Sequence, residues 1–561
     1  MKIVKFLSKL GTSQLLKQLN PRTNELLKHF NILEKATTKK IVSLFISSIG
    51  YEKILKTKEI RNSLIDTLNS SEVKTLSENI KKGEKTNYYK YLKNLKFSKN
   101  SKEYLAIKKF FEIETQVEIK DEKDVENLTI SLKKDNESEV KSLYPLFKHQ
   151  IKASQECINI LKGKTPRVFL HMPTGSGKTR TAINVMCSLI REKTEKFVIV
   201  WLANKEELCD QAFEEFFKAW QILGNQKIKV FKHFGGVRSN LEKISEYSEE
   251  NSAVIFSSLD MMYEDLTNNI SSIIKLSHNV GLVVMDEAHL TIAKTYQNII
   301  EILAPTQSTG ILGLSATPGR SYRNVEEDIK LKDFYYGQKV NLKIKGEKNI
   351  IEWLIKEKYL AKVEIKKINF EADLAKLFSQ KEIENEMLRI KEGKDYSKTF
   401  RDKISNDNER IELILDLIKE QSSNEEKILV FASSKNNAIA IADLLNMDGY
   451  NCASITSDTD PTLRREIIQD FKKLNSKINI LINYDVLTTG FDAPKTRIAI
   501  ITRPTTSIVL YHQMIGRVVR GEKQGGNRTC KVLTVVDTYL PGYRDLADSF
   551  YFWEDIWNDN E

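Results

Sequence analysis

The sequence predicts an α/β protein in which two tandem domains with parallel sheets follow a mostly α-helical N-terminal domain. Three observations support this prediction. Leucine and phenylalanine recur at helical spacing in the first thirty residues. Short apolar runs alternate with helical segments from Tyr144, and a second alternating set begins at Lys427. The chain of 561 residues is also too long for one hydrophobic core.

Four segments follow from this pattern. Residues 1–142 form a basic, mostly helical module, 143–330 the first α/β domain, 331–410 a connecting region and 411–561 the second α/β domain. The acidic run Glu112–Glu139 ends the first segment and is the predicted linker. It is polar, lacks strong periodicity and changes the sign of the charge.

The N-terminal module carries the positive charge of the chain. Residues 1–110 have a net charge of +15, whereas the whole chain has +11. This excess indicates a polyanionic partner, such as nucleic acid, for the module. A protein partner, for example an effector or a nuclease, is a further possibility, and lysine-rich solvated helix faces are the alternative without a partner. The tyrosines of Lys85–Lys93 are interpreted as a packed helical core rather than a base-stacking surface.

The predicted strands are short apolar runs between helical segments. The first set comprises Arg167–His171, Phe197–Leu202, Ala253–Ser257, Gly281–Met285 and Gly310–Leu314. The second set comprises Lys427–Ala432, Asn451–Thr456, Ile478–Asn483, Arg497–Ile501 and Lys531–Val536.

A phosphate-binding loop is predicted at Gly175–Thr179, which reads Gly-Ser-Gly-Lys-Thr. It follows a strand that ends near His171 and precedes a helix over Thr181–Ile190, which is the context that such a loop requires. Glycines let backbone N–H groups approach phosphate oxygens, and the helix N-terminus adds favourable partial charge. We expect Lys178 to reach the β- and γ-phosphates and Thr179 to hold Mg²⁺.

Two adjacent carboxylates, Asp286 and Glu287, follow the apolar run Val283–Met285. A carboxylate at a strand end coordinates Mg²⁺ directly or through water, and its neighbour orients or deprotonates the attacking water. We therefore expect a metal ligand at Asp286 and a general base at Glu287.

Two arginines, Arg517 and Arg520, are three residues apart, which places them on one face of a predicted helix. Both arginines lie between the last two predicted strands of the second set. An arginine that reaches a nucleotide from the opposite domain accelerates its hydrolysis by about 10³–10⁵-fold. Together with the loop and the carboxylates, these arginines predict a nucleotide hydrolase whose active site lies between two domains.

These motifs resemble those of superfamily 2 helicases and translocases of the DEAH type. The resemblance covers about residues 143–540 and is closest to the RadD- and XPB-type branch and the motor subunits of restriction enzymes. Further matching segments are Phe147–Gln150, Trp201–Gln211, Ser257–Asp260, Leu314–Pro318, Ile428–Ala432, Thr488–Asp492, Arg503–Ser507 and Leu510–Met514.

The resemblance implies two RecA-like domains, ATP and Mg²⁺ in the cleft between them, and nucleic acid across both. It assigns adenine recognition to Gln150 and a place facing the γ-phosphate to Gln513. It also assigns the coupling of hydrolysis to domain movement to Ser315 and Thr317. The expected site residues are Lys178, Asp286, Glu287, Gln513, Arg517 and Arg520 for catalysis, Gln150, Gly175, Ser176, Gly177, Lys178, Thr179 and Asp286 for the nucleotide, and Thr179 and Asp286 for the metal.

The resulting hypothesis is an ATP-dependent DNA helicase or translocase that acts in DNA repair, restriction or defence against phage. Two alternatives remain open. One is an ATP-gated clamp or scaffold on nucleic acid that recruits a partner nuclease or effector. The other is an RNA helicase, because backbone tracking does not identify the sugar without contacts to the 2′-hydroxyl.

Composition excludes several other classes. No apolar run approaches the roughly 20 residues that cross a bilayer, so we expect no membrane association. The five cysteines are scattered without the paired spacing of a zinc site or a disulfide framework. This usage is typical of reduced thiols in a cytoplasmic protein.

Overall fold

The computed structural model describes most of the chain in two compact units. The described residues are 2–81, 87–95, 101–113, 142–193, 195–236, 239–317, 325–344, 347, 349–371, 373–392, 394–422, 426–473, 475–487, 491, 493–538 and 540. One unit comprises Met1–Glu139 and Lys435–Ser454, and the other comprises Val140–Ser434 and Ile455–Glu561. Of the predicted features, the linker beyond Ile113 and the segment Thr488–Asp492, apart from Phe491, lie outside the described residues.

The first unit is built from short helices. Its N-terminal helices are α1 (Lys2–Leu7), α2 (Thr12–Lys17), α3 (Pro21–His29), α4 (Ile32–Lys35), α5 (Thr38–Ile49), α6 (Tyr51–Lys56), α7 (Lys58–Asp66), α8 (Ser70–Ile80), α9 (Tyr88–Lys93) and α10 (Lys102–Phe110). Proline at the first position of α3 suits a helix start, and the side chain of Asn20 accepts a hydrogen bond from the N–H of Arg22 there. The periodic residues Leu15, Leu26 and Leu27 are buried, which explains the helical spacing in the sequence.

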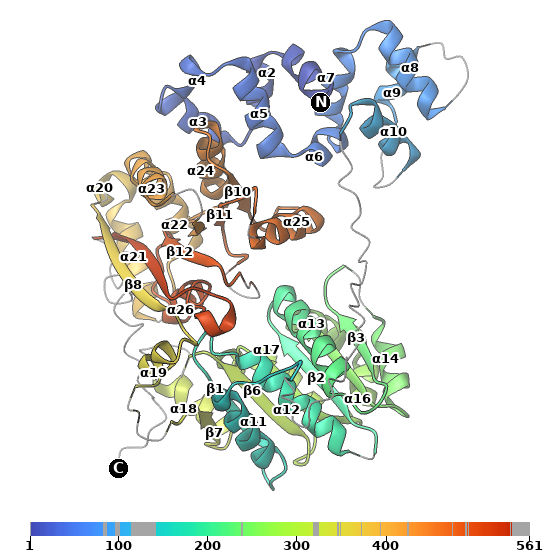
Figure 1. Ribbon diagram of the computed structural model, residues 1–561, viewed down its shortest axis with the longest axis vertical. Helices are drawn as coiled ribbons and strands as arrows, with labels where there is room; N and C mark the ends of the chain where they lie inside the picture. The colour runs from blue at the N-terminus through green and yellow to red at the C-terminus, as the bar shows by residue number, and fades with distance from the viewer. Residues whose placement is uncertain are drawn as a thin grey trace, which may run out of the picture. The chain divides into compact units, whose positions relative to one another are not determined.

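A helix from much later in the chain completes this unit. The helix α24 (Lys435–Met447) packs against α3 and α5, as Figure 1 shows. Its buried carboxylate, Asp443, accepts hydrogen bonds from the hydroxyls of Thr23 at 2.8 Å and Ser48 at 3.0 Å. Burial raises the pKa of Asp443 to about 7, although both hydrogen bonds act to lower it.

The tyrosines of the N-terminal module take part in packing. The hydroxyl of Tyr89 donates to the carbonyl oxygen of Leu68 at 2.6 Å, and Leu92 on the same helix is fully buried. These contacts agree with the interpretation of the patch as helical core. Lys85 and Thr86, at its start, lie outside the described residues.

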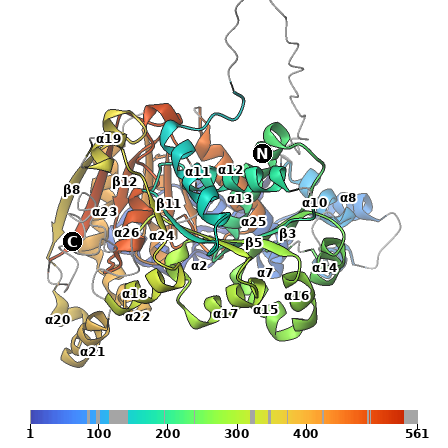
Figure 2. The same cartoon turned by 90° about the horizontal axis from the view of Figure 1, so that it is seen from below.

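The first α/β domain of the second unit contains a seven-stranded parallel sheet in the order β3-β4-β2-β5-β6-β1-β7. Its strands are β1 (Arg167–His171), β2 (Val198–Ala203), β3 (Lys229–His233), β4 (Ala253–Ser258), β5 (Val280–Asp286), β6 (Gly310–Ser315) and β7 (Lys339–Asn341). The helices are α11 (Lys148–Leu161), α12 (Lys178–Glu192), α13 (Glu206–Leu223), α14 (Leu241–Ser248), α15 (Leu259–Asn268), α16 (Ile270–Ser277), α17 (Lys294–Leu303) and α18 (Val325–Phe334). Figure 2 shows α11, α12 and α13 on one face of this sheet and α15, α16 and α17 on the other.

The second sheet has six strands in the order β10-β11-β9-β12-β13-β8, and the pairs from β11 to β8 are parallel. Its strands are β8 (Lys362–Phe370), β9 (Lys427–Phe431), β10 (Cys452–Ile455), β11 (Ile480–Asn483), β12 (Thr496–Ile501) and β13 (Thr529–Asp537). The remaining helices are α19 (Ile350–Lys356), α20 (Leu374–Leu377), α21 (Gln380–Lys391), α22 (Lys398–Ser405), α23 (Asn408–Gln421), α25 (Pro461–Lys472) and α26 (Ile508–Ile515).

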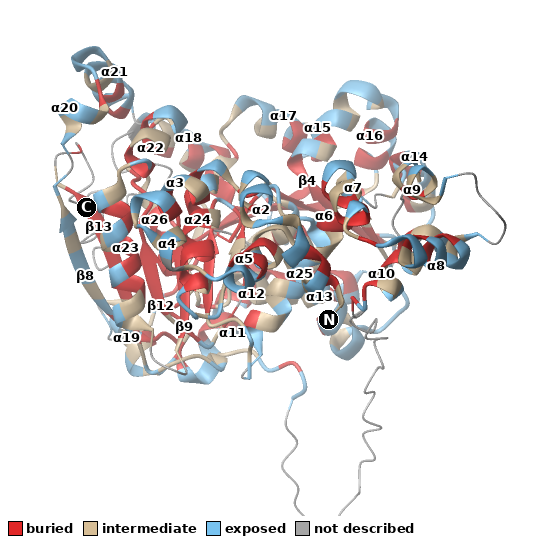
Figure 3. Ribbon diagram, turned by 90° about the horizontal axis from the view of Figure 1, so that it is seen from above, coloured by how far each residue is buried: buried red, intermediate tan, exposed pale blue. Residues whose placement is uncertain are grey.

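The strand β8 forms the edge of the second sheet and comes from the segment that the sequence leaves as a connecting region. Its residues alternate largely between exposed and more buried, and Figure 3 shows the strand as mostly exposed. A charged edge suits this position because it discourages pairing with other chains.

One buried arginine ties the second sheet together. Arg410 at the start of α23 is fully buried and forms a bidentate ion pair with Asp537 at the end of β13, at 2.7 and 3.0 Å. The same guanidinium donates to the carbonyl oxygen of Thr502, just beyond β12, at 2.6 Å. A buried arginine with all these partners fixes the ends of two strands relative to one helix.

The predicted fold class is confirmed: two α/β domains with parallel sheets and a helical N-terminal region. Within the described part of the chain, no helix is both long and apolar enough to span a bilayer. The five cysteines are free, and four of them are buried.

The burial of Asp443 makes the packing of α24 sensitive to pH. A carboxyl group with a raised pKa stabilises the folded state most at low pH, and that contribution is lost as the pH rises from 3.8 towards 7. Between pH 5 and pH 8, the hydrogen-exchange protection of α24, corrected for intrinsic exchange rates, should fall by about 100-fold. Asp443→Asn mimics the protonated group and should remove this fall.

The control is Glu59→Gln, which changes an exposed carboxylate on α7 and should leave the pH dependence as in the unmodified protein. Equal pH dependence in the Asp443→Asn variant would contradict the assignment.

Candidate active site

The predicted phosphate loop lies at the carboxyl end of β1 and leads into α12. Gly175 and Gly177 have φ angles of 83° and 92°, in the region that favours glycine. A Cβ on Gly177 would also lie 2.0 Å from Nε2 of Gln150. Among the described residues, no side chain caps the start of α12. The helix therefore presents its first backbone N–H groups where an anion binds.

Two residues of the preceding helix hold this loop in place. Gln150 donates from Nε2 to the carbonyl oxygen of Ser176 at 3.0 Å and accepts a hydrogen bond from the N–H of Phe147 at 2.9 Å. Nε2 of His149 lies 3.1 Å from the same oxygen of Ser176, and burial lowers the pKa of this histidine. The rings of Phe147 and Tyr359 lie 4.6 Å apart beside them. An aromatic group and an amide next to a phosphate loop form a suitable environment for a nucleotide base.

The two predicted carboxylates lie at the carboxyl end of β5 and are buried, with exposed fractions of 3% for Asp286 and 6% for Glu287. Burial raises the pKa of Asp286 to about 6, against the opposing effect of Lys178. Burial also acts to raise the pKa of Glu287, but Lys178, His289 and Arg517 outweigh it, so that this pKa is lowered. A nearby cation would therefore stabilise the ionised form of Asp286, whereas Glu287 remains ionised without one.

The donor set fits a magnesium ion. Thr179 is half-buried at the start of α12, and Asp286 is a buried carboxyl group whose ionised form a cation would stabilise. No cluster of three or more histidine, cysteine or acidic side chains suited to a metal occurs among the described residues. Magnesium commonly uses only one or two carboxylates together with phosphate oxygens and water, so no such cluster is required.

The second α/β domain contributes polar groups to the same carboxylates. The side chain of Gln513 on α26 forms a hydrogen bond with Glu287, and the charge of Arg517 acts on both Asp286 and Glu287. Arg517 is held by the carbonyl oxygens of Phe491 at 2.7 Å and Gln513 at 3.1 Å. Residues more than 200 positions apart in the sequence therefore meet at one site.

The prediction that Arg517 and Arg520 share one face of a helix is wrong. The helix α26 ends at Ile515, and Arg520 lies in an isolated antiparallel bridge with Leu360. The chain turns at Gly516, where a Cβ would lie 2.0 Å from Cγ2 of Thr174 in the phosphate loop. A side chain at position 516 would therefore collide with the loop, so that only glycine fits at this point of the turn.

The segment that starts at Ser315 lies beside the phosphate loop. The N–H of Met172 donates to the carbonyl oxygen of Ser315 at 3.1 Å, and Ser315 pairs with His171 across the sheet. The hydroxyl of Ser315 donates to the carbonyl oxygen of Thr317 at 2.8 Å. Pro318, the last residue of this predicted motif, lies outside the described residues.

Further polar contacts join the two α/β domains. Nζ of Lys205 donates to the carbonyl oxygen of Asp485 at 2.8 Å, and burial lowers the pKa of this lysine. Arg464 on α25 forms an ion pair with Glu207 on α13 at 2.9 Å. Lys205 and Glu207 belong to a predicted motif, whereas no pattern in the sequence singled out Asp485 or Arg464.

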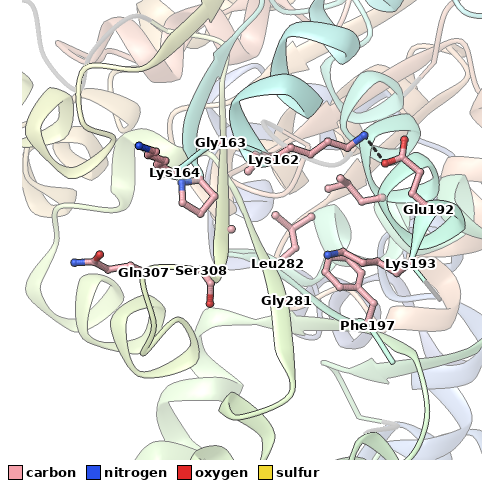
Figure 4. Close-up of a pocket in the computed structure, with 14 residues that line it drawn as sticks. Lys162, Gly163, Lys164, Glu192, Lys193, Phe197, Gly281, Leu282, Gln307 and Ser308 are labelled. Atoms are coloured by element: carbon pink, nitrogen blue, oxygen red, sulfur yellow. Dashed lines mark ion pairs between the residues drawn. The ribbon is translucent and has the colours of Figure 1, made fainter. Parts of the chain in front are cut away.

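A separate hollow of about 690 Å³ lies at the opposite edge of the first sheet. Its lining includes Gly281 and Gly310, near the amino ends of β5 and β6, whereas the motif residues lie at the carboxyl ends. Figure 4 shows Lys162 paired with Glu192 at its rim. This hollow therefore does not belong to the candidate active site.

The comparisons with known proteins match both α/β domains. Residues 143–320 match the family described as "Type III restriction enzyme, res subunit", and residues 409–522 match "Helicase conserved C-terminal domain". The "Putative ATP-dependent helicase IRC3" of Saccharomyces cerevisiae is 27% identical over 381 residues. The matched residues cover 66% of this chain and 49% of the yeast protein.

Two further similarities come from a phage and from a solved structure. The "51.5 kDa protein" of a Lactococcus phage is 25% identical over 388 residues, which cover 69% of each chain. The solved structure of the "ATP-dependent Type ISP restriction-modification enzyme LlaBIII bound to DNA" has a TM-score of 0.50 and 16% identity, and covers 74% of this chain and 29% of that one. The matched part spans about half the length of the yeast relative.

Proposed function

The chain belongs to superfamily 2 of the helicases, and from that premise we propose that it is an ATP-driven motor that moves along DNA. The observation that carries the proposal is the meeting of groups from both α/β domains at one pair of carboxylates. Asp286 and Glu287 share a buried site with Lys178 of the same domain and with Gln513 and Arg517 of the other. Hydrolysis at such a site is linked to the relative movement of the two domains.

The roles of the residues follow from their chemistry. Lys178 and the N–H groups of the loop bind the phosphates, and Gln150 contacts the base. Glu287 keeps a lowered pKa and orients or deprotonates the attacking water, while Gln513 holds its carboxylate. Mg²⁺, when held by Thr179 and Asp286, supplies positive charge to the phosphate oxygens.

The two arginines complete the proposed site. Arg517 and Arg520 supply charge from the second domain as the phosphate–oxygen bond breaks. Because Arg517 already acts on the carboxylates, a change in the position of the second domain changes their electrostatic environment.

Replacing Glu287 with glutamine tests the assignment of the base. The amide keeps the size of the side chain but cannot accept the proton, so kcat for ATP hydrolysis should fall by about 10²–10⁴-fold while nucleotide affinity is retained. Steady-state hydrolysis and the binding of a fluorescent ATP analogue provide the two readouts. Turnover at the original rate would refute the proposed site.

The choice of DNA rests on the family description and on the relatives. The first matched family is described by a restriction enzyme subunit, and the structure of LlaBIII is titled as bound to DNA. These similarities favour DNA over RNA and suggest a role in restriction, repair or defence against phage. The scattered reduced cysteines suit action in the cytoplasm.

Polymer-dependent hydrolysis should distinguish the possible tracks. We expect duplex or single-stranded DNA to raise the steady-state rate of ATP hydrolysis by at least about tenfold, because the track favours the closed, catalytic arrangement of the domains. RNA of equal length and protein without polymer are the comparisons. Stimulation by RNA alone would replace the DNA motor with an RNA helicase.

The number of ATP molecules used per binding event tests the second alternative, an ATP-gated clamp or scaffold. Many turnovers before release from the polymer support a motor. A single turnover per release supports a clamp that recruits a nuclease or another effector.

We propose that residues 1–142 add a basic surface that loads the motor onto DNA. The positive charge of the first 110 residues supports this role. Deletion of the module is a poor test, because it would uncover the parts of α24 that pack against α3 and α5 and would leave Asp443 without its two hydroxyl partners.

Replacement of exposed lysines leaves that packing intact. A triple alanine variant at Lys74, Lys90 and Lys102 should weaken DNA binding and reduce the slope of log affinity against log salt by up to about 0.9 per lysine. The matched control carries alanine at Lys227, Lys275 and Lys294, which are exposed lysines of the first α/β domain. An unchanged salt slope in the first variant would instead assign the module to a protein partner.

A further inference from the structure

A tight turn, Gly521–Asn527, follows Arg520 and brings Gln524 back towards it. The N–H of Gly526 donates to the carbonyl oxygen of Gly521 at 3.0 Å, and the N–H of Asn527 donates to that of Arg520 at 2.9 Å. A Cβ on Gly526 would lie 2.1 Å from the same oxygen of Arg520, so only glycine allows this approach. The turn is thus folded closely onto the backbone of Arg520.

The amide of Gln524 makes three hydrogen bonds to three different segments. Its oxygen accepts from Nη1 of Arg520 at 2.7 Å. Its nitrogen donates to the carbonyl oxygen of Gly175 in the phosphate loop at 2.5 Å and to that of Tyr359 at 2.9 Å. One neutral side chain of the second domain therefore joins the loop of the first domain to an arginine.

These bonds are compatible with a phosphate in the loop. Phosphate is bound by the N–H groups of such a loop, whereas Gln524 uses a carbonyl oxygen. The amide also carries no charge, so it orients the guanidinium without neutralising it. A carboxylate in the same place would compensate the positive charge of Arg520 and would lose the two donated bonds.

We propose that Gln524 is a positioning residue that sets Arg520 against the phosphate loop. This inference rests on the proposed ATP hydrolysis and adds a residue from outside the matched helicase motifs. Arginine is a long side chain with considerable rotamer freedom, and a bond from Nη1 to a side chain that is itself fixed on the loop restricts that freedom. The turn therefore defines where the arginine lies when the two domains meet.

The test is a double-mutant cycle in the full-length protein with Gln524→Ala, Arg520→Ala and the double variant. A misplaced catalytic group costs on the order of 10²-fold in rate. Gln524→Ala should therefore lower kcat by up to about 10²-fold. The KM for ATP and the affinity for a fluorescent ATP analogue should change less than about twofold. In the Arg520→Ala background, the same substitution should have no further effect on kcat, because the group that it positions is gone.

Two further variants sharpen the test. Gln524→Glu should lower kcat at least as far as Gln524→Ala, since the carboxylate neutralises the arginine and cannot donate. Glu522→Ala, on the same turn, removes an exposed ion pair with Lys358 and should leave kcat unchanged. An unchanged kcat in Gln524→Ala, or an equal loss with and without Arg520, would overturn the proposal.

Lys178→Ala separates this result from a failure of the proposed function. If the unmodified protein hydrolyses ATP no faster than Lys178→Ala, the proposed function fails and the positioning role fails with it. If hydrolysis depends on Lys178 but not on Gln524, only the positioning role is refuted.

Discussion

Two adjacent negative charges, buried at the end of one strand, impose the main electrostatic requirement on this protein. Asp286 and Glu287 are almost without solvent, and burial by itself disfavours the ionised form of both. Lys178 offsets part of this cost from within the same domain, and Arg517 contributes from the other domain. The first α/β domain alone therefore lacks part of the positive charge that acts on its two carboxylates. The attraction between Arg517 and the two carboxylates therefore also stabilises the contact between the two domains.

Most of the parallel strands were predictable because they are continuous apolar runs. Such runs arise wherever both faces of a strand are covered, and all six residues of β2, β4 and β6 are buried. The strands that the sequence did not reveal, β3, β7 and β8, lie at sheet edges. The run Lys362–Phe370 interleaves lysine and glutamate with apolar residues, and its pattern is weak because one side faces water. A continuous apolar run marks a strand that is covered on both faces, and β3, β7 and β8 lack such a run because they are less buried.

The candidate site was predictable where a role is encoded in a short string. Glycines, lysine and threonine after a strand, or two carboxylates after another, specify their chemistry locally. The place of Arg520 was not predictable, because this residue pairs in an antiparallel bridge with Leu360, which is 160 positions away in the sequence. The role of Gln524 was not predictable for the same reason, because its partners Gly175 and Tyr359 lie far away in the sequence. The glycines at 521, 525 and 526 signal a turn, but only the folded chain shows what the turn reaches.

The contact between α24 and the N-terminal helices has a consequence for biosynthesis. Thr23 and its partner Asp443 are separated by 420 positions. A ribosome that adds about 5–20 residues per second needs roughly 20–80 s to proceed from one to the other. During that interval, α3 and α5 have been made but the helix that covers them has not. The apolar surface that α24 later buries is then available to chaperones or to other nascent chains, so that the rate of translation becomes a determinant of yield.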